Sequence, residues 1–266
     1  MNDSGRLHNR NVGTLLRHWR TTRGISQLTL SLDAEISMRH LSYVETGRAE
    51  PSREMVLRLA EALGVPLRER NTLLLAAGYA PLYRETGLDA PELGEAKQAV
   101  ELILAHHEPY PAVVMDRHWN LLMANPATTR FLSLFPAFDV PGAPNGLRLV
   151  FHPNGIRSFI DNWDELAGAM INEMHRELAA DPSDAVGREL LAELVAYPGV
   201  PSRWSAADLD RSPTPLLVAN YSYAGGLLRF FTTMTTFGTP QHVTMQELRI
   251  ECFFPADERT RSMMAL

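Results

Sequence analysis

The 266-residue sequence contains one cysteine, Cys252, and one lysine, Lys97. A single cysteine excludes an intramolecular disulfide and a zinc site built from thiolates, so we expect Cys252 to be a small, buried apolar residue. The N-terminal stretch lacks the apolar core of a signal peptide, and no apolar run reaches the length that spans a membrane. These absences predict a cytoplasmic protein without a membrane partner.

Positive charge is scarce as well, and it is unevenly distributed. The chain carries 25 basic and 31 acidic side chains, a net charge of −6. Residues 1–80 hold 11 arginines against 8 acidic residues (+3), whereas residues 81–266 hold 14 basic against 23 acidic residues (−9). This asymmetry is typical of a chain with one part that faces nucleic acid, although chance remains the alternative for so small a difference.

Two short helical patterns separated by a tight turn occupy residues 24–52. Ser26 is typical of an N-cap and begins the first pattern, and Ser37 begins the second after a turn at residues 34–36. Leu41 and Val44 are three residues apart and face the core together. The start of the second helix then faces outward, and the side chains that it exposes are those of Met38, Arg39, His40 and Tyr43. A polar, arginine-containing helix end of this kind fits the major groove of DNA.

Three further helices are predicted around this pair, over residues 12–23, after Ser52 and after Pro66. The first 80 residues therefore form a domain of five helices. Residues 81–97 are rich in proline, glycine and acidic residues and are predicted to be a linker to a second domain, residues 98–266.

The motifs I-S-Q (25–27), S-x-R-H-L-S (37–42) and E-x-G-R-x-x-P-S (45–52) resemble the helix-turn-helix of lambda-type phage repressors and of the xenobiotic-response-element (XRE) family. The resemblance implies an all-α, lambda-repressor-like five-helix bundle that binds double-stranded operator DNA. We expect a homodimer, because one monomer contacts too few phosphates for tight binding. The family usually has glycine where this chain has Glu35, so Glu35 is expected to adopt a left-handed conformation at a modest cost.

The resemblance also implies roles for individual side chains. Met38, Arg39 and Tyr43 match positions that contact base edges, and Ser37 and His40 match positions near phosphates. Gln27 matches a glutamine that contacts the DNA backbone and braces the recognition helix, and Arg48 is a further phosphate candidate. Arg20 and Glu45 match positions that pair between the first and third helices; two independent surface charges are the alternative.

The pattern of the second half is mixed. Helices are predicted over about 92–107, 126–135, 156–178 and 183–196, the third as one long amphipathic helix. Strands are predicted on both sides of a turn at residues 116–118, over 216–223 and 227–237 with a hairpin turn at 224–226, and over 248–254. Residues 244–247 (T-M-Q-E) imitate a helical capping box, but we interpret this short stretch as the approach to the last strand.

Three further motifs resemble the ligand-binding domain of MmyB-like transcription regulators: N-W-D-E-L-A (162–167), Y-P-G-V-P-S-R-W (197–204) and the run F-G-T-P to P-A-D-E (237–258). The resemblance implies a PAS-like α+β domain with an antiparallel sheet and a cavity for a fatty-acid-like ligand. The whole chain would then be a multidomain protein with one α and one mixed α and β domain.

Candidate ligand contacts follow from the apolar stripes. The long helix presents Trp163, Met170 and Met174, and the strand opposite presents Leu228, Phe230 and Met234 on one face and Phe231 on the other. Period-two alternation does not tell which face is inward. For the ligand's head group, Arg148, Arg157 and Arg229 are equal candidates. Core filling is the alternative for any single methionine.

Neither metal chemistry nor catalysis is indicated by the motifs. The histidines at 106, 107, 118 and 152 lack the spacing of a zinc site, and the chain has no G-x-S-x-G, P-loop or G-x-G-x-x-G sequence. We therefore expect a non-enzymatic transcriptional regulator without a cofactor other than a bound fatty acid or similar ligand. The alternatives are a DNA-binding head fused to an enzyme for an acyl or other apolar substrate, and a protein-interaction adaptor.

Overall fold

The computed structural model describes residues 11–181, 183–207 and 216–265. The chain divides into two compact units. The first runs to Gly87 and also includes Gly238–Gln246, and the second comprises Leu88–Phe237 and Glu247–Leu266. No helix in the described parts of the chain is long and apolar enough to cross a membrane.

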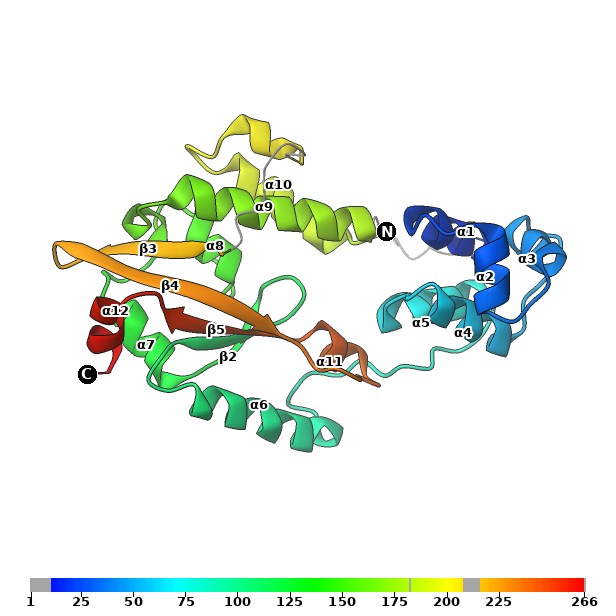
Figure 1. The fold of residues 1–266 in the computed structure, drawn as a ribbon, viewed down its shortest axis with the longest axis horizontal. Coiled ribbons are helices and arrows are strands. Elements are labelled where there is room, and N and C mark those ends of the chain that lie inside the picture. Colours follow the sequence, from blue (N-terminus) through cyan, green and yellow to red (C-terminus); the bar gives the residue numbers. More distant parts are fainter. Residues whose placement is uncertain (1–10, 182, 208–215, 266) are drawn as a thin grey trace. The chain divides into compact units, whose positions relative to one another are not determined.

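Five helices build the first unit, coloured blue to cyan in Figure 1. They are α1 (Val12–Thr22), α2 (Gln27–Asp33), α3 (Met38–Glu45), α4 (Arg53–Ala62) and α5 (Leu67–Ala76). Three of them begin at a serine whose hydroxyl accepts a hydrogen bond from the backbone three residues on, at Ser26, Ser37 and Ser52. Each cap satisfies an amide that the first helical turn leaves unpaired, which is why these boundaries agree with the sequence. The expected five-helix bundle is confirmed.

The core of this bundle brings the backbones of α1 and α3 into contact. A methyl group on Gly13 would lie 2.0 Å from the carbonyl oxygen of Val44, so only glycine fits where the two helices cross. Leu16, Leu30 and Leu41 are fully buried around this point. In the turn between α2 and α3, Glu35 adopts a φ of 54°, the left-handed conformation expected there.

A five-stranded antiparallel sheet forms the centre of the second unit. Its strands are β1 (Ala112–Met115), β2 (Leu121–Ala124), β3 (Val218–Tyr223), β4 (Gly226–Thr235) and β5 (Arg249–Pro255), in the spatial order β2-β1-β5-β4-β3. The β3–β4 hairpin turns at Ala224 and Gly225, both with positive φ (48° and 71°), which matches the twist of the strands. The expected α+β domain with an antiparallel sheet is confirmed.

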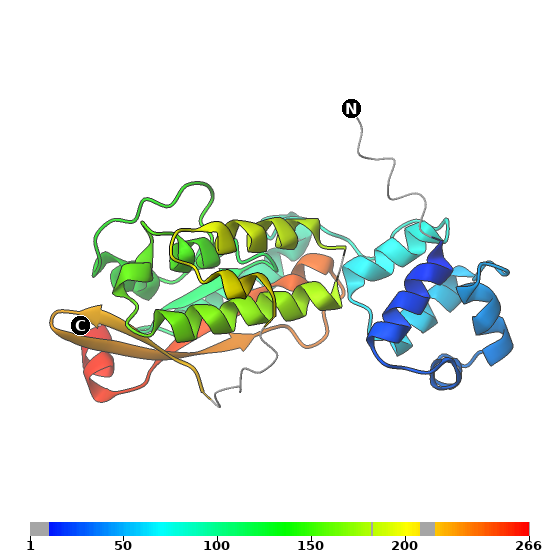
Figure 2. The ribbon, with the colours of Figure 1, turned by 90° about the horizontal axis from the view of Figure 1, so that it is seen from above.

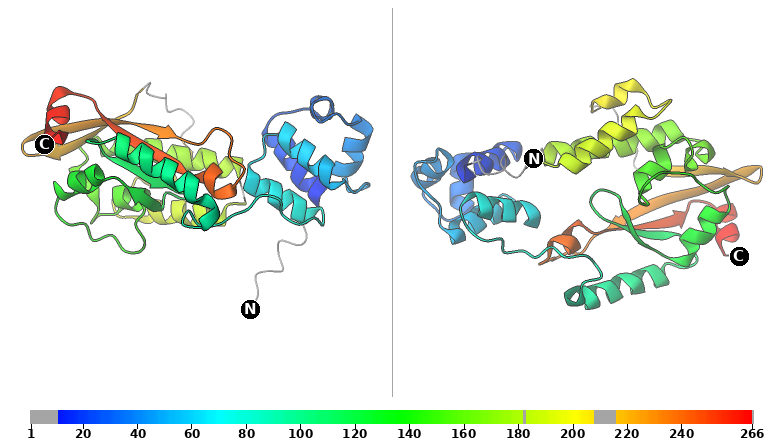
Figure 3. Two further views of the ribbon diagram at one scale, coloured as in Figure 1. Left: turned by 90° about the horizontal axis from the view of Figure 1, so that it is seen from below. Right: turned by 180° about the vertical axis from the view of Figure 1, so that it is seen from behind.

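Helices cover the two faces of the sheet unequally (Figures 1 and 2). Helix α6 (Gly94–His106), preceded by a 3-10 turn (η3, Pro91–Leu93), lies on one side and buries Val100 and Leu104. The longer α9 (Trp163–Ala180) lies on the opposite side, as the view from behind in Figure 3 also shows. The main core cluster of this unit includes residues of α7 (Pro126–Ser133), α8 (Gly146–Phe151), α9 and α10 (Ala185–Ala196). The remaining short elements are η4 (Ile156–Phe159), η5 (Ser202–Ser205), α11 (Val243–Glu247) and α12 (Glu258–Met264).

The prediction of one helix over 156–178 is wrong in its first part. Residues 156–159 form the 3-10 turn η4, Ile160 then makes a β-bridge with Tyr221, and α9 begins at Trp163. Around the break, Asn162 exchanges hydrogen bonds with the edge of β3, donating to Val218 O and accepting from Asn220 N. The apolar period continues through the break, but these contacts with a distant strand interrupt the helix.

The interpretation of residues 244–247 is also wrong. They belong to the short helix α11, as the capping-box pattern alone would have indicated, and β5 begins only at Arg249. Val243 and Met245 of α11 are both buried. Because Val243–Gln246 pack in the first unit, they do not extend the sheet of the second.

Candidate nucleic-acid interface and effector site

The outward face of α3 carries most of the predicted DNA contacts. Ser37, Met38, Arg39 and Arg48 are exposed, and His40 and Tyr43 are half-buried. The Nε of Arg39 donates to the hydroxyl of Tyr43 at 3.2 Å, and the guanidinium lies 5.4 Å from the centre of the tyrosine ring. This contact holds Arg39 in place, and no described residue accepts a hydrogen bond from its Nη groups, which can therefore make a bidentate bond to a guanine.

A buried ion pair fixes the angle at which α3 is presented. Arg20 of α1 makes two hydrogen bonds with the carboxylate of Glu45 in α3, at 2.7 and 2.9 Å, and a third to Ile25 O at 3.0 Å. Gln27 of α2 donates to the same carboxylate at 2.7 Å. The side chain of Glu45 is 1% exposed and that of Arg20 is 12% exposed. Three helices therefore meet at one carboxylate, and the predicted pair is present.

Electrostatics keep this carboxylate ionised. Burial by itself would raise the pKa of Glu45, but the hydrogen bonds from Arg20 and Gln27 hold that pKa below its ordinary value. The same contact raises the pKa of Arg20. Gln27 is thus placed to brace the recognition helix, as expected; its contact with the DNA backbone stays a prediction.

In the second unit, the ambiguity about the faces of β4 is resolved. Leu228 and Phe230 are fully buried in one core cluster with Trp163 and Met174, and Met170 packs against that cluster. We call this side of the sheet its inner face. Met234 lies on the same side by alternation but is 44% exposed.

Phe231 is on the opposite side from these residues. Its ring stacks on Phe254 at 5.3 Å, and Phe254 in turn contacts His107 at the end of α6. Its inclusion among the ligand contacts is therefore corrected, because alternate residues of a strand point to opposite faces. The remaining contacts on the inner face stay predictions.

Each of the three arginines proposed for the head group has a protein partner. Arg148 makes two hydrogen bonds of 2.8 Å with Glu193. The guanidinium of Arg157 lies 3.7 Å from the centre of the Trp163 ring and donates to the carbonyls of Pro198 and Gly199. Arg229 donates to Asn220 and lies 3.9 Å from Asp257. A ligand carboxylate would have to compete with these contacts.

Two family models match the chain. Residues 96–266 match the MmyB-like transcription regulator ligand binding domain, and residues 11–73 match a helix-turn-helix domain. The chain belongs to the MmyB-like transcription regulators. It is a DNA-binding transcriptional regulator with a ligand-binding domain.

Among curated relatives, this MmyB-like regulator is similar to the transcriptional regulator ClgR of two Mycobacterium tuberculosis strains, CDC 1551 and H37Rv. The identity is 34% over 88 residues, which cover 33% of this chain and 76% of the relative. Among solved structures, the PAS domain of Bordetella pertussis BvgS is 12% identical, with a TM-score of 0.29 over 65% of this chain and 94% of that chain. An RNA-binding light-oxygen-voltage receptor is 13% identical, with a TM-score of 0.25 over 96% of this chain and 63% of that chain.

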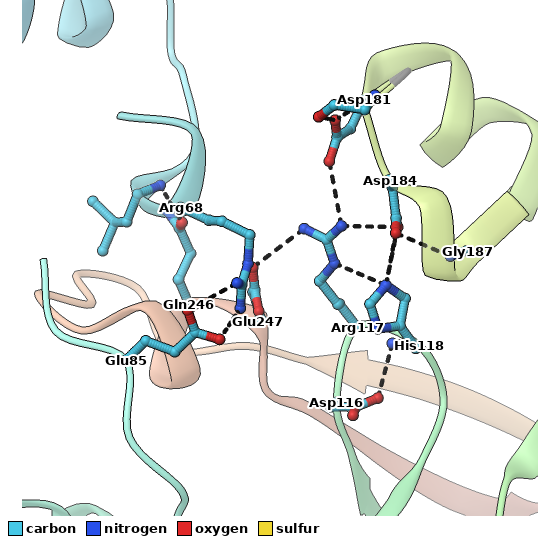
Figure 4. A network of polar contacts seen from close by, with 12 residues as sticks. Arg68, Glu85, Asp116, Arg117, His118, Asp181, Asp184, Gly187, Gln246 and Glu247 are labelled. Carbon is cyan, nitrogen blue, oxygen red and sulfur yellow. Dashed lines mark hydrogen bonds and ion pairs between the residues drawn. The ribbon is translucent and has the colours of Figure 1, made fainter. Parts of the chain in front are cut away.

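The connection between β4 and β5 of this MmyB-like regulator packs in its DNA-binding unit. Val243 N donates to Arg84 O at 2.9 Å, and the hydroxyl of Thr244 donates to Thr86 O at 2.6 Å. Helix α5 begins after Pro66, whose side chain offers no cap. Instead Gln246, 179 residues later in the chain, accepts a hydrogen bond from Leu67 N at 2.6 Å (Figure 4). Helix α5 is therefore capped by a residue of the segment that connects β4 with β5.

Glu247, the residue after Gln246, makes its contacts in the second unit. Glu247 accepts a hydrogen bond of 3.4 Å from Arg117, in the turn between β1 and β2 (Figure 4). Arg117 also lies 2.8 Å from Asp184, which begins α10 and interacts with His118 at 3.0 Å. Burial alone would raise the pKa of Asp184, but the Gly187 amide and Arg117 hold it below its ordinary value. The boundary between the units thus falls inside α11.

Sequence reasoning missed Gln246, Arg117 and Asp184 as members of this network, because only the fold brings these distant positions together. The single cysteine and the possible metal sites can also be compared with the sequence analysis.

Cys252 is buried, as predicted, and burial raises the pKa of its thiol. Among the residues that the structure describes, no group of three histidine, cysteine or acidic side chains is arranged to hold a metal ion.

Proposed function

We propose that this protein binds an operator as a homodimer, and that a small apolar, fatty-acid-like effector in the PAS-like unit changes its operator affinity. Sequence would be read by the exposed start of α3, with Arg39 as the principal base contact and Ser37, His40 and Arg48 near phosphates. The protein acts in the cytoplasm, where the operator is, and as a regulator rather than an enzyme.

The effector would lie between α9 and the inner face of the sheet. This layer is lined by Trp163, Met170 and Met174 on the helix side and by Leu228 and Phe230 on the strand side. Burial of an acyl chain contributes about 0.8 kcal/mol for each methylene, so a long chain binds usefully even when its head group is poorly matched. Lipid extracted from the purified protein and identified by mass spectrometry tests this directly.

One observation supports a coupling between effector binding and operator binding: the segment that connects β4 with β5 packs in the DNA-binding unit. A ligand against the inner face would contact both strands. The segment that connects these strands contains Gln246, which caps α5. A change in the register or twist of β4 and β5 would therefore alter the support of the helical bundle. Such a coupling requires that the effector favour one arrangement of this element over the other.

The coupling is tested with Gln246→Ala in the full-length chain. Loss of a helix cap costs about 0.5–2 kcal/mol, too little to unfold the bundle, so both binding activities should survive. We expect operator affinity, measured by fluorescence anisotropy on the upstream region of its own gene, to become insensitive to added dodecanoic acid. Gln241→Ala is the matched control, because Gln241 is exposed in the same segment. An intact response in Gln246→Ala would rule out α11 as the coupling element.

A further inference from the structure

An acidic side chain lies on the inner face of the middle strand. Glu251 is in β5, the middle strand of the sheet, opposite Val113 of β1 and Met234 of β4. The residues on either side of it in alternation both face inward. Phe253 packs against the main core cluster, and Arg249 pairs with Glu177 of α9 at 2.7 Å. The carboxyl of Glu251 therefore points into the layer in which the proposed effector would lie.

The surroundings of Glu251 are mostly apolar. Burial raises its pKa to about 7, against an opposing hydrogen bond from Thr232 of β4. Glu251 nevertheless keeps part of its surface accessible.

Among the residues that the structure describes, no arginine, lysine or histidine forms an ion pair with Glu251. Tyr221 of β3 is buried, and Glu251 contributes to the raised pKa of that tyrosine. On its own strand, Arg249 is held by Glu177 and lies over the Trp119 ring at 5.5 Å. The arginines at 148, 157 and 229 are engaged with other partners, as described above. The described groups around Glu251 thus include the hydroxyl of Thr232 and the phenol of Tyr221 but no paired cation.

We propose that Glu251 contacts the effector's head group and selects an apolar ligand that ends in a hydrogen-bond donor, a hydroxyl or a protonated carboxyl, rather than a carboxylate anion. This inference rests on the effector site proposed above. Two carboxylates in one desolvated site cannot both be ionised, so a fatty acid would have to share one proton with Glu251. A long-chain alcohol can donate to Glu251 in either of its ionisation states.

The experiment compares two ligands that differ only at the head group, dodecanoate and 1-dodecanol, with the full-length protein at pH 6 and pH 8.5. Because the bound pair holds one proton, dodecanoate affinity should fall about tenfold for each pH unit above the pKa of Glu251, and about 30-fold by pH 8.5. The affinity of 1-dodecanol should not fall. In Glu251→Gln, dodecanoate should bind equally well at both pH values. Glu101→Gln, an exposed site on α6, is the control and should behave as the wild type.

A second variant covers the case in which Glu251→Gln does not fold, as judged by circular dichroism. Thr232→Val removes the hydrogen bond that lowers the pKa of Glu251, so the pH at which dodecanoate affinity begins to fall should move upward. Dodecanoate binding that is independent of pH in the wild type, and unaltered in either variant, would overturn the role of Glu251. Failure of both ligands to bind would instead remove the effector site itself.

Discussion

Removal of either partner of the Arg20–Glu45 pair should destabilise the helical bundle far more than the loss of an ordinary surface ion pair. Glu45→Ala leaves the guanidinium of Arg20, 12% exposed, with the Ile25 carbonyl as its one acceptor among the described residues. Arg20→Ala leaves a carboxylate that is 1% exposed, with the Gln27 amide as its one donor in the same part of the chain. Breaking a buried pair on one side costs about 3–5 kcal/mol, because it leaves an uncompensated charge. An exposed pair is worth about 0–1 kcal/mol.

The assay is a double-mutant cycle in the full-length chain. Hydrogen exchange of peptides from α1 to α5, measured by mass spectrometry in increasing urea, reports the opening free energy of the bundle separately from that of the second unit. The double variant should cost at least about 1 kcal/mol less than the sum of the single variants, since neither charge is then left alone. Glu85→Ala is the control, because Glu85 lies in the same unit and its pair with Arg68 is exposed (52% for Glu85, 33% for Arg68); it should cost less than about 1 kcal/mol.

The pair also has a pH signature. The folded-state pKa of Glu45 is lower than its ordinary value, so its contribution is complete at neutral pH and is lost as the pH falls through the folded-state pKa. Glu45→Ala should flatten the acid side of the stability profile of the bundle. Single-variant costs that add within about 0.5 kcal/mol, with an unaltered acid limb, would refute a coupled buried pair.

Three further predictions concern DNA, ligand and pH. Arg39→Ala should weaken operator binding by roughly 1–3 kcal/mol and relax the preference at one base pair, whereas Arg48→Ala should weaken all duplexes alike and reduce the salt slope. Equal losses on operator and random DNA for both variants would remove the role of Arg39. Met170→Trp should abolish uptake of a fluorescent fatty acid without altering the circular dichroism spectrum, and unchanged uptake would place the ligand elsewhere. With a folded-state pKa of about 7 against an ordinary value of 4.5, Glu251 should make the protein less stable as the pH rises from 4.5 to about 7, with no further loss above that. In urea titrations at pH 5 and pH 8, Glu251→Gln should remove up to about 3 kcal/mol of that loss, and equal pH slopes would contradict it.

The sequence alone determined most of the DNA-binding bundle. Ser26, Ser37 and Ser52 begin helices where their hydroxyls can cap the first turn, and glycine or Glu35 occupies the left-handed positions between helices. Caps, turns and apolar periods act within a few residues of the chain, so they can be read without knowing the fold. The motifs of the second half likewise identified the family and the hairpin at Ala224–Gly225.

Only the tertiary structure decided the properties that depend on distant partners. The long helix breaks before Trp163 because Ile160 and Asn162 pair with β3. The inner face of β4 is the one that carries Phe230, since strand alternation is symmetric until a helix covers one side. Helix α5 takes its cap from Gln246, 179 residues away. Hydrogen bonds and desolvation act through space, and partners far apart in the sequence come together only when the chain has folded.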